Sequence, residues 1–136
     1  MIRYSSVTIE REAQTLFDNI DFRVEEGEFI YLIGKVGAGK SSLLKTIYAE
    51  LPITDGNARV FDYNLKKIKR SQIPYLRRNL GIIFQDFRLL TDRSVNDNLD
   101  FVLKATGWKS KEQREERIRE VLALVGMETK GWRMPN

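Results

Sequence analysis

The chain has 136 residues, of which 42% are hydrophobic and 31% charged, with a formal net charge of +4. This length suits one domain with a core of its own and excludes a two-domain protein. The absence of Cys and His excludes a disulfide framework, a thiolate zinc site and histidine acid–base chemistry. No apolar run reaches the roughly 20 residues of a membrane-spanning helix, and the N-terminus lacks a signal-peptide profile. We therefore expect a cytoplasmic protein.

The first third of the chain predicts strands on either side of a short link. Residues 2–10 and 16–24 alternate in part between apolar and polar side chains, as half-exposed strands do, and we expect them to pair antiparallel. A turn at 25–28 leads into the continuous apolar run 29–33, which predicts a buried strand. The helical spacing of apolar residues over 41–50 predicts a helix.

The remaining predicted elements are two strands and three helices. Residues 57–63 predict a strand, 71–79 a short helix with Pro74 in its first turn, and 80–84 a second buried apolar strand. Ser94 caps a predicted helix that stops at Gly107. Ser110 and Gln113 form a predicted capping box for a helix ending at Gly126, and residues 127–136 indicate an irregular tail.

A glycine-rich motif lies between the apolar run 29–33 and the predicted helix. Residues 34–41 read G-x-x-x-x-G-K-S, the pattern of a phosphate-binding loop, in the order strand, loop, helix that such a loop requires. Backbone N–H groups and the helix N-terminus would converge on an anion. Lys40 would reach the β- and γ-phosphates, and the Ser41 hydroxyl would be a ligand of Mg²⁺. The alternative is a glycine turn that binds nothing, which the flanking elements make the weaker interpretation.

The positive charge is concentrated between residues 59 and 78, where only Asp62 opposes it. The cations are Arg59, Lys66, Lys67, Lys69, Arg70, Arg77 and Arg78. No aromatic stacking platform is interleaved with them, so a solvated surface is favoured over a site for nucleic acid or anionic lipid.

The loop, the strand pair ahead of it and residues 81–86 together resemble the first half of an ABC-type ATPase domain. Within that family, residues 74–99 resemble the FtsE group of bacterial cell-division ATP-binding proteins, and the similarity covers essentially all of residues 1–136. The resemblance implies an α/β fold of the P-loop NTPase class, ABC ATPase type, with an antiparallel β subdomain.

The resemblance also implies a binding site for ATP and Mg²⁺. Gln85 would be the Q-loop glutamine, completing the Mg²⁺ shell together with Ser41. Asp86 as a Walker B acid is a rival interpretation, which we reject because Gln85 interrupts the apolar run that such a strand needs. The expected nucleotide-binding residues are Gly34, Lys35, Val36, Gly37, Ala38, Gly39, Lys40, Ser41, Ser42 and Gln85.

The implied partners are a membrane protein of the FtsX type, contacted through the region after Gln85, and a second copy of the parent protein in a homodimer. No nucleic acid is expected. The parent would lie on the inner face of the cell membrane and couple ATP binding and hydrolysis to its partner during cell division. The alternatives are an ATPase of a lipoprotein-release or macrolide-export transporter, a non-hydrolysing nucleotide-responsive module, and a P-loop nucleotide kinase, which the strands ahead of the loop disfavour.

Two features depart from the family pattern. The position of the usual adenine-stacking aromatic falls near Glu10 and Arg11. The sequence also contains no Leu-Ser-Gly-Gly signature, no apolar strand ending in Asp-Glu and no switch histidine. We therefore expect residues 1–136 to form the N-terminal part of a nucleotide-binding domain, stopping before the signature motif. Such a part would bind nucleotide weakly without turnover, and its uncovered apolar surfaces would favour self-association.

Overall fold

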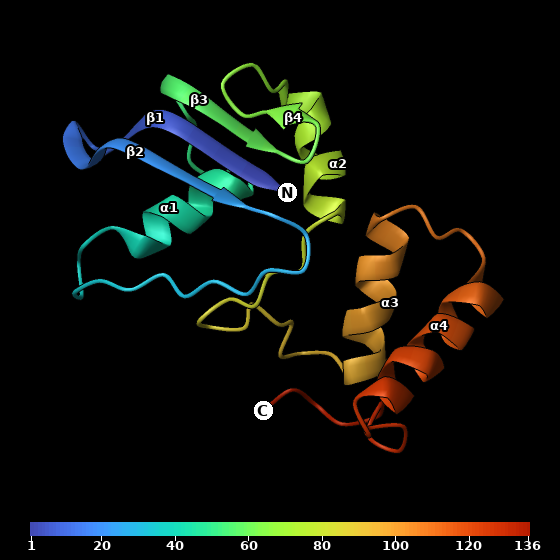
Figure 1. The fold of residues 1–136 in the computed structure, drawn as a ribbon. Coiled ribbons are helices and arrows are strands. Elements are labelled where there is room, and N and C mark those ends of the chain that lie inside the picture. The colour runs from blue at the N-terminus through green and yellow to red at the C-terminus, as the bar shows by residue number, and fades with distance from the viewer. The chain divides into compact units, whose positions relative to one another are not determined.

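The computed structural model describes residues 1–136, which divide into two units, Met1–Gly81 and Ile82–Asn136 (Figure 1). The first unit contains a β-sheet, helix α1 and a short helical segment, and the second contains two longer helices. The α/β class expected from the sequence, with an antiparallel β subdomain, is confirmed, because helices and an antiparallel sheet occur together.

The sheet has four strands in the order β2-β1-β3-β4, and all neighbours are antiparallel. The strands are β1 (Ile2–Arg11), β2 (Gln14–Val24), β3 (Asp55–Val60) and β4 (Tyr63–Asn64). The predicted pairing of the first two strands is confirmed. The predicted strand 57–63 is divided, because a turn at Phe61 and Asp62 separates β3 from β4.

Strand β1 is irregular where β3 approaches it. Its pairing with β3 shifts register between Ser5 and Thr8, and Ser6 has a positive φ of 52°. Gly56 lies opposite this bulge with φ 86°, and a Cβ there would be only 2.2 Å from the Ser6 carbonyl oxygen. Any other residue at position 56 would collide with backbone, so the register of β3 against β1 depends on this glycine.

Helix α1 (Lys40–Ile47) supplies the other side of the hydrophobic core. The Thr46 hydroxyl donates to the Leu43 carbonyl (2.6 Å), so the fully buried Tyr4 hydroxyl donates to Thr46 Oγ1 (2.7 Å). This bond joins the central strand to the helix. The buried apolar residues of the cluster are Tyr4, Val7, Ile9, Leu43, Ile53, Ala58, Val60, Leu65 and Leu76.

A short helical segment completes the first unit. A 3₁₀ turn (Arg70–Gln72) leads directly into α2 (Ile73–Arg78), which confirms the helix predicted over 71–79. Pro74 lies at the start of α2, where its missing N–H leaves no helical bond unmade. Leu76 is fully buried and fixes α2 to the core.

The two buried strands predicted at 29–33 and 80–84 are not formed. Both segments are irregular, and Phe29, Tyr31 and Ile33 are 82%, 78% and 88% exposed, with Ile83 at 92%. A strand without neighbours is only weakly stabilised, because its stability comes from hydrogen bonds and side-chain contacts with adjacent strands. Neither segment pairs with a strand of this chain, so the prediction was wrong for these residues.

The second unit contains α3 (Val95–Ala105) and α4 (Lys111–Leu124), whose N-caps are Ser94 and Ser110 as predicted. The predicted capping box is only half formed, because the Gln113 side chain makes no bond back to the Ser110 N–H. The Ser94 side chain accepts from the Asp97 N–H, and the Ser110 side chain accepts from the Gln113 N–H. On α4, Ile118 and Leu122 are buried, whereas Val125, the C-cap residue, is 66% exposed. No helix of the structure has the length and apolar character needed to cross a bilayer.

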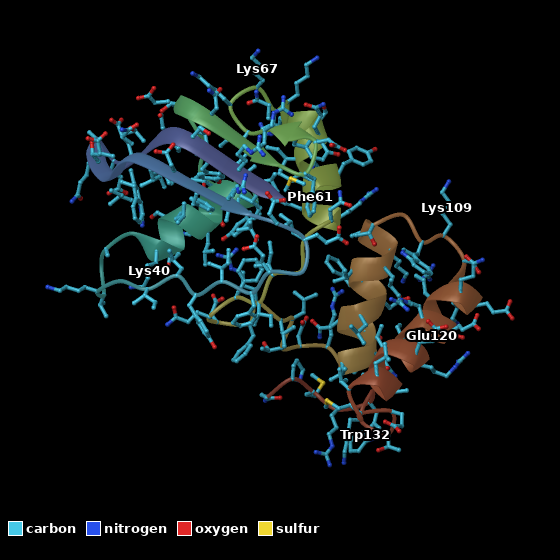
Figure 2. The ribbon with its side chains drawn as sticks, viewed as in Figure 1. Lys40, Phe61, Lys67, Lys109, Glu120 and Trp132 are labelled. Carbon is cyan, nitrogen blue, oxygen red and sulfur yellow. The ribbon has the colours of Figure 1, made fainter.

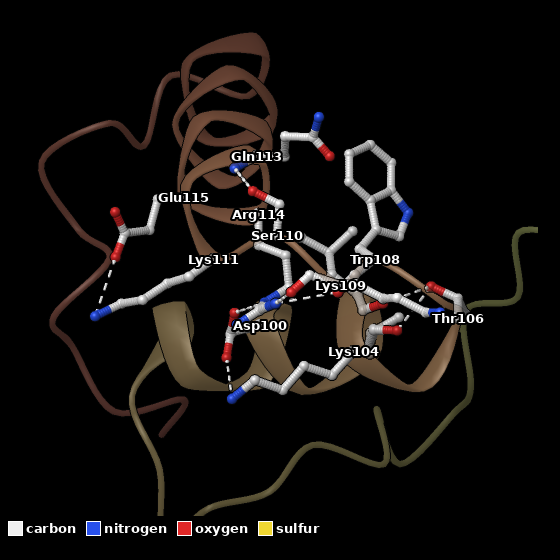
Figure 3. A network of polar contacts seen from close by, with 12 residues as sticks. Asp100, Lys104, Thr106, Trp108, Lys109, Ser110, Lys111, Gln113, Arg114 and Glu115 are labelled. Carbon is white, nitrogen blue, oxygen red and sulfur yellow. Dashed lines mark hydrogen bonds and ion pairs between the residues drawn. The ribbon is translucent and has the colours of Figure 1, made fainter.

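Buried Arg114 on α4 joins the two helices of this unit (Figure 3). Its Nε donates to Asp100 Oδ1 of α3 at 2.6 Å, and its Nη1 donates to the carbonyls of Trp108 and Lys109 at 3.0 and 2.9 Å. Lys104 contacts the other oxygen of Asp100 at 2.8 Å. These contacts from Lys104 and Arg114 lower the pKa of Asp100 below its usual range.

The Tyr4–Thr46 bond predicts a distinctive titration. Burial raises the pKa of Tyr4 to about 12. The neutral phenol is favoured in the folded state, so the stabilisation is complete below pH 10 and is lost as pH rises toward 12. Absorbance at 295 nm should show a late-titrating tyrosine, which Tyr4→Phe removes at a cost of about 1 kcal/mol in stability. Unchanged late absorbance in Tyr4→Phe would contradict this assignment.

The Arg114 contacts predict that this residue determines the stability of the second unit. Arg114→Met should destabilise it by about 2 kcal/mol, because two carbonyls lose a charged donor. The matched control Arg117→Met, which removes an exposed pair with Glu120, should cost less than about 0.5 kcal/mol. Urea unfolding followed by circular dichroism compares them. Equal losses in the two variants would show that burial of Arg114 has no energetic consequence.

Candidate phosphate-binding site

The predicted phosphate-binding loop leads directly into α1, which begins at Lys40 (Figure 2). Gly39 is the N-cap residue and has a left-handed backbone with φ 92°, which turns the chain from the loop into the helix. No side chain caps this helix, and its first turn holds no acidic residue. The first-turn N–H groups and the positive end of the helix dipole are therefore available to an anion.

Gly39 also touches strand β2. A Cβ at position 39 would be 3.0 Å from Phe17 Cε2 and 3.2 Å from Leu16 Cβ. Because residue 39 also has positive φ, a larger side chain would be both strained and crowded. The loop end is thus held against the sheet by a contact between residues 22 positions apart. Phe17 is a positioning residue that the sequence pattern did not reveal.

The loop amides have few partners within the chain. The only main-chain bond inside residues 34–39 is from the Ala38 N–H to the Lys35 carbonyl, at 3.1 Å. The N–H groups of Val36, Gly37 and Gly39 donate no hydrogen bond within the chain, and the loop is exposed from Gly34 to Ala38. Unpaired N–H groups gathered beside a helix N-terminus form a site suited to phosphate oxygens.

The Lys40 ammonium curls back over the loop. Its Nζ donates to the carbonyls of Gly34 and Lys35, at 2.5 and 2.8 Å. These bonds keep a positive charge at the mouth of the loop. Both acceptors are neutral, so a phosphate oxygen would be a stronger partner for the same ammonium.

The two serines that begin α1 differ in their surroundings. Ser41 is exposed and its hydroxyl is accessible to a metal ion, whereas Ser42 is only 3% exposed and faces the core. Ser42 can therefore contribute its backbone N–H rather than its side chain. The donor set at the loop consists of hydroxyl and amide groups, which suits phosphate and a hard cation such as Mg²⁺.

Gln85 lies in the second unit, so its role beside the loop stays a prediction. It is exposed in a turn that the Phe87 N–H closes by donating to the Phe84 carbonyl at 3.1 Å. The Arg88 guanidinium covers the Phe84 ring at 4.2 Å from its centroid. Phe87 and Arg88 have positive φ values of 58° and 49°, so the segment that follows Gln85 is sharply folded.

Glu10 and Arg11 lie where an adenine-stacking aromatic was expected. They pair with Thr15 and Gln14 at the tip of the β1–β2 hairpin and are exposed. The hairpin tip therefore presents a guanidinium rather than an aromatic ring.

Sequence comparisons place this site in a family. The model of the ABC transporter family matches residues 17–135. The cell division ATP-binding proteins FtsE of Streptococcus pneumoniae and Mycobacterium tuberculosis are 37% and 36% identical over 122 and 138 residues. These matches cover 90% and 100% of this chain but 53% and 60% of the relatives, so the chain spans little more than half their length. The methionine import protein MetN 1 of Pectobacterium atrosepticum is 36% identical, over 96% of this chain and 39% of that protein.

Solved structures agree with the sequence relatives. The dimeric structure of MJ0796, a bacterial ABC transporter cassette, has a TM-score of 0.84 and 26% identity and covers 100% of this chain and 62% of that one. A dimeric post-hydrolysis state of the same cassette, bound to ADP and phosphate, has a TM-score of 0.83 and 25% identity with the same coverage. The chain belongs to the ABC transporter family of ATP-binding proteins.

Proposed function

We propose that residues 34–42 bind the phosphates of ATP and that the chain is the N-terminal part of a nucleotide-binding domain of the FtsE type. The observation that carries this proposal is the set of unpaired loop amides beside the start of α1, with the Lys40 ammonium held over them. The family relationship indicates that the bound nucleotide is ATP.

Binding would exchange weak internal contacts for strong external ones. Lys40 would leave the carbonyls of Gly34 and Lys35 and donate to the β- and γ-phosphate oxygens instead. The N–H groups of Val36, Gly37 and Gly39 would donate to the same oxygens. Because these amides are already unpaired, the loop gives up no main-chain bond to bind its ligand.

Mg²⁺ fits the residues proposed to hold it. The Ser41 hydroxyl and the Gln85 side-chain carbonyl are neutral oxygen ligands, and they would hold the ion together with phosphate oxygens and water. When bound, the ion would neutralise phosphate charge. Gln85 would also position the attacking water in the complete site.

The FtsE assignment extends the family relationship to cell division. The supporting observation is that several FtsE proteins match at 36–37% identity over most of the chain. MetN importers match nearly as well, at 33–36% identity, so methionine import is the second candidate function. In the FtsE case, the parent would work as a homodimer on the inner face of the cell membrane. It would couple ATP binding and hydrolysis to a membrane protein of the FtsX type.

The segment after Gln85 is the proposed contact with that membrane protein. It exposes Phe87 and Leu89, which are 69% and 50% accessible. Asn98 on α3 holds the end of the segment by donating to the carbonyls of Leu90, Arg93 and Ser94, at 2.9, 3.3 and 3.0 Å. Apolar side chains on an anchored segment suit a docking contact.

Replacement of the loop lysine tests nucleotide binding. Lys40→Ala should weaken Mg-ATP binding at least about tenfold, because the triphosphate loses its charged donor. Calorimetry gives the affinity, and the amide resonances of residues 34–41 report where the ligand binds. Lys67→Ala, which removes an exposed cation of the same unit, is the control and should bind normally. Resonances of the loop that stay unmoved by millimolar Mg-ATP would refute the site.

Hydrolysis requires groups that residues 1–136 do not provide. Phosphoryl transfer depends on charge stabilisation from both sides of the phosphate, and the sequence lacks a Leu-Ser-Gly-Gly signature and a switch histidine. The 136-residue chain should therefore release phosphate no faster than its Lys40→Ala variant. Turnover that disappears on Lys40→Ala would show that these residues suffice for catalysis.

A further inference from the structure

Three arginines lie side by side across the sheet. Arg3 of β1 pairs in register with Arg23 of β2 on one side and with Arg59 of β3 on the other. All three are exposed, whereas their neighbours Tyr4 and Ala58 are buried, so the arginines occupy the outer face of the sheet. Adjacent strands are about 4.8 Å apart, which gives the row a length of about 10 Å.

This arrangement opposes stability. Like charges directly opposite one another on neighbouring strands repel. Of the three arginines, only Arg23 has an acidic partner, with its Nε 3.6 Å from Glu25 Oε1. Arg3 and Arg59 form no ion pair. A row of cations with so little internal compensation is suited to an external anion.

The positive surface continues past the edge of the row. Asn64 of β4 lies opposite Arg59, and its side-chain oxygen accepts from the Lys66 N–H at 3.0 Å. Buried Leu65 holds this segment to the core, so the lysines that follow are exposed at the sheet edge, where Figure 2 shows Lys67 extending outward. We name the resulting surface the basic strip; it consists of Arg3, Arg23, Arg59, Lys66, Lys67 and Lys69.

Two nearby arginines do not belong to the strip, because their guanidinium groups contact other residues of the first unit. Arg77 Nε donates to the Tyr48 carbonyl at 2.8 Å. The Arg78 guanidinium lies over the Tyr75 ring, 4.9 Å from its centroid.

The surroundings of the strip favour a membrane over nucleic acid. Ser5 and Asn57, the outward pair next to the arginine row, are polar and small and offer no ring on which a base could stack. Asp21 lines the same hollow as Arg3 and Arg23, and its carboxylate accepts from the Ser6 N–H at 2.9 Å. At the end of the same strands, Met1 and Phe61 are 58% and 41% exposed, and the Phe61 N–H donates to the Met1 carbonyl at 2.9 Å. Cations flanked by an exposed aromatic and an aliphatic side chain are the composition of a membrane-interface contact.

We propose that the basic strip binds the surface of a lipid bilayer that carries acidic headgroups. The guanidinium groups of the row donate to lipid phosphates, the lysines add long-range attraction, and Phe61 enters the headgroup region. This surface contains no residue of the nucleotide site. Its binding is therefore independent of nucleotide.

Vesicle co-sedimentation of the full chain without nucleotide tests the proposal. The chain should bind vesicles containing phosphatidylglycerol and phosphatidylcholine, but not phosphatidylcholine alone, and high salt should weaken the binding. The triple variant Arg3→Gln, Arg23→Gln, Arg59→Gln should bind about 100-fold more weakly. It should remain folded, because the substitutions relieve repulsion. The matched control Lys109→Gln, Lys111→Gln, Arg119→Gln changes net charge equally in the second unit and should bind normally.

Two further variants test the part played by Phe61 and the independence from the nucleotide site. Phe61→Asn keeps a residue that tolerates the φ of 51° at that turn, and it should lower the vesicle binding that survives at high salt. Lys40→Ala should bind vesicles like the unchanged chain, whatever its nucleotide affinity. The proposal is overturned by equal binding to neutral vesicles, by equal losses in the two triple variants, or by tighter binding to a single-stranded RNA or DNA duplex at the same salt concentration.

Discussion

The first unit depends on the central position of β1. This strand pairs with β2 on one edge and β3 on the other, and its Tyr4 hydroxyl reaches across the core to Thr46 of α1. A single strand thus determines the register of the sheet and the position of α1 against it. The predicted phosphate-binding loop precedes α1 directly, so the position of its amides follows from the same contacts. The contact of Gly39 with Phe17 adds a second attachment between loop and sheet.

The loop combines a fixed end with an adaptable one. Gly39 and the start of α1 are held by the sheet, whereas residues 34–38 are exposed and share one main-chain hydrogen bond. Lys40 belongs to the fixed part, but its side chain spans the adaptable part through two carbonyl contacts. Such a division suits phosphate binding, since the helix N-terminus is preorganised while the glycine-rich segment is able to close on the anion.

Local signals in the sequence predicted the local structure well. The β1–β2 hairpin, the Ser94 and Ser110 caps and the helix after the loop are confirmed, because each depends on residues close together in the chain. The strands predicted at 29–33 and 80–84 were wrong, because a buried strand also requires neighbours and apolar composition does not reveal which ones are present. The Gly39–Phe17 contact and the Arg3–Arg59 pairing were missed because both depend on register between distant segments. The roles of Gln85 and the loop residues stay predictions.

The proposed lipid-binding surface and the residues that support the predicted phosphate-binding loop lie on different faces of one sheet. Side chains alternate along β1, so Tyr4 points into the core toward α1 while Arg3 lies on the outer face with Arg23 and Arg59. The position of the loop depends on contacts of the inner face. The positive charge of the arginine row lies on the outer face. Substitution of the outer arginines therefore removes positive charge without removing any contact that holds the loop in position. The alternation that makes a strand amphipathic also makes the two functions separable by mutation.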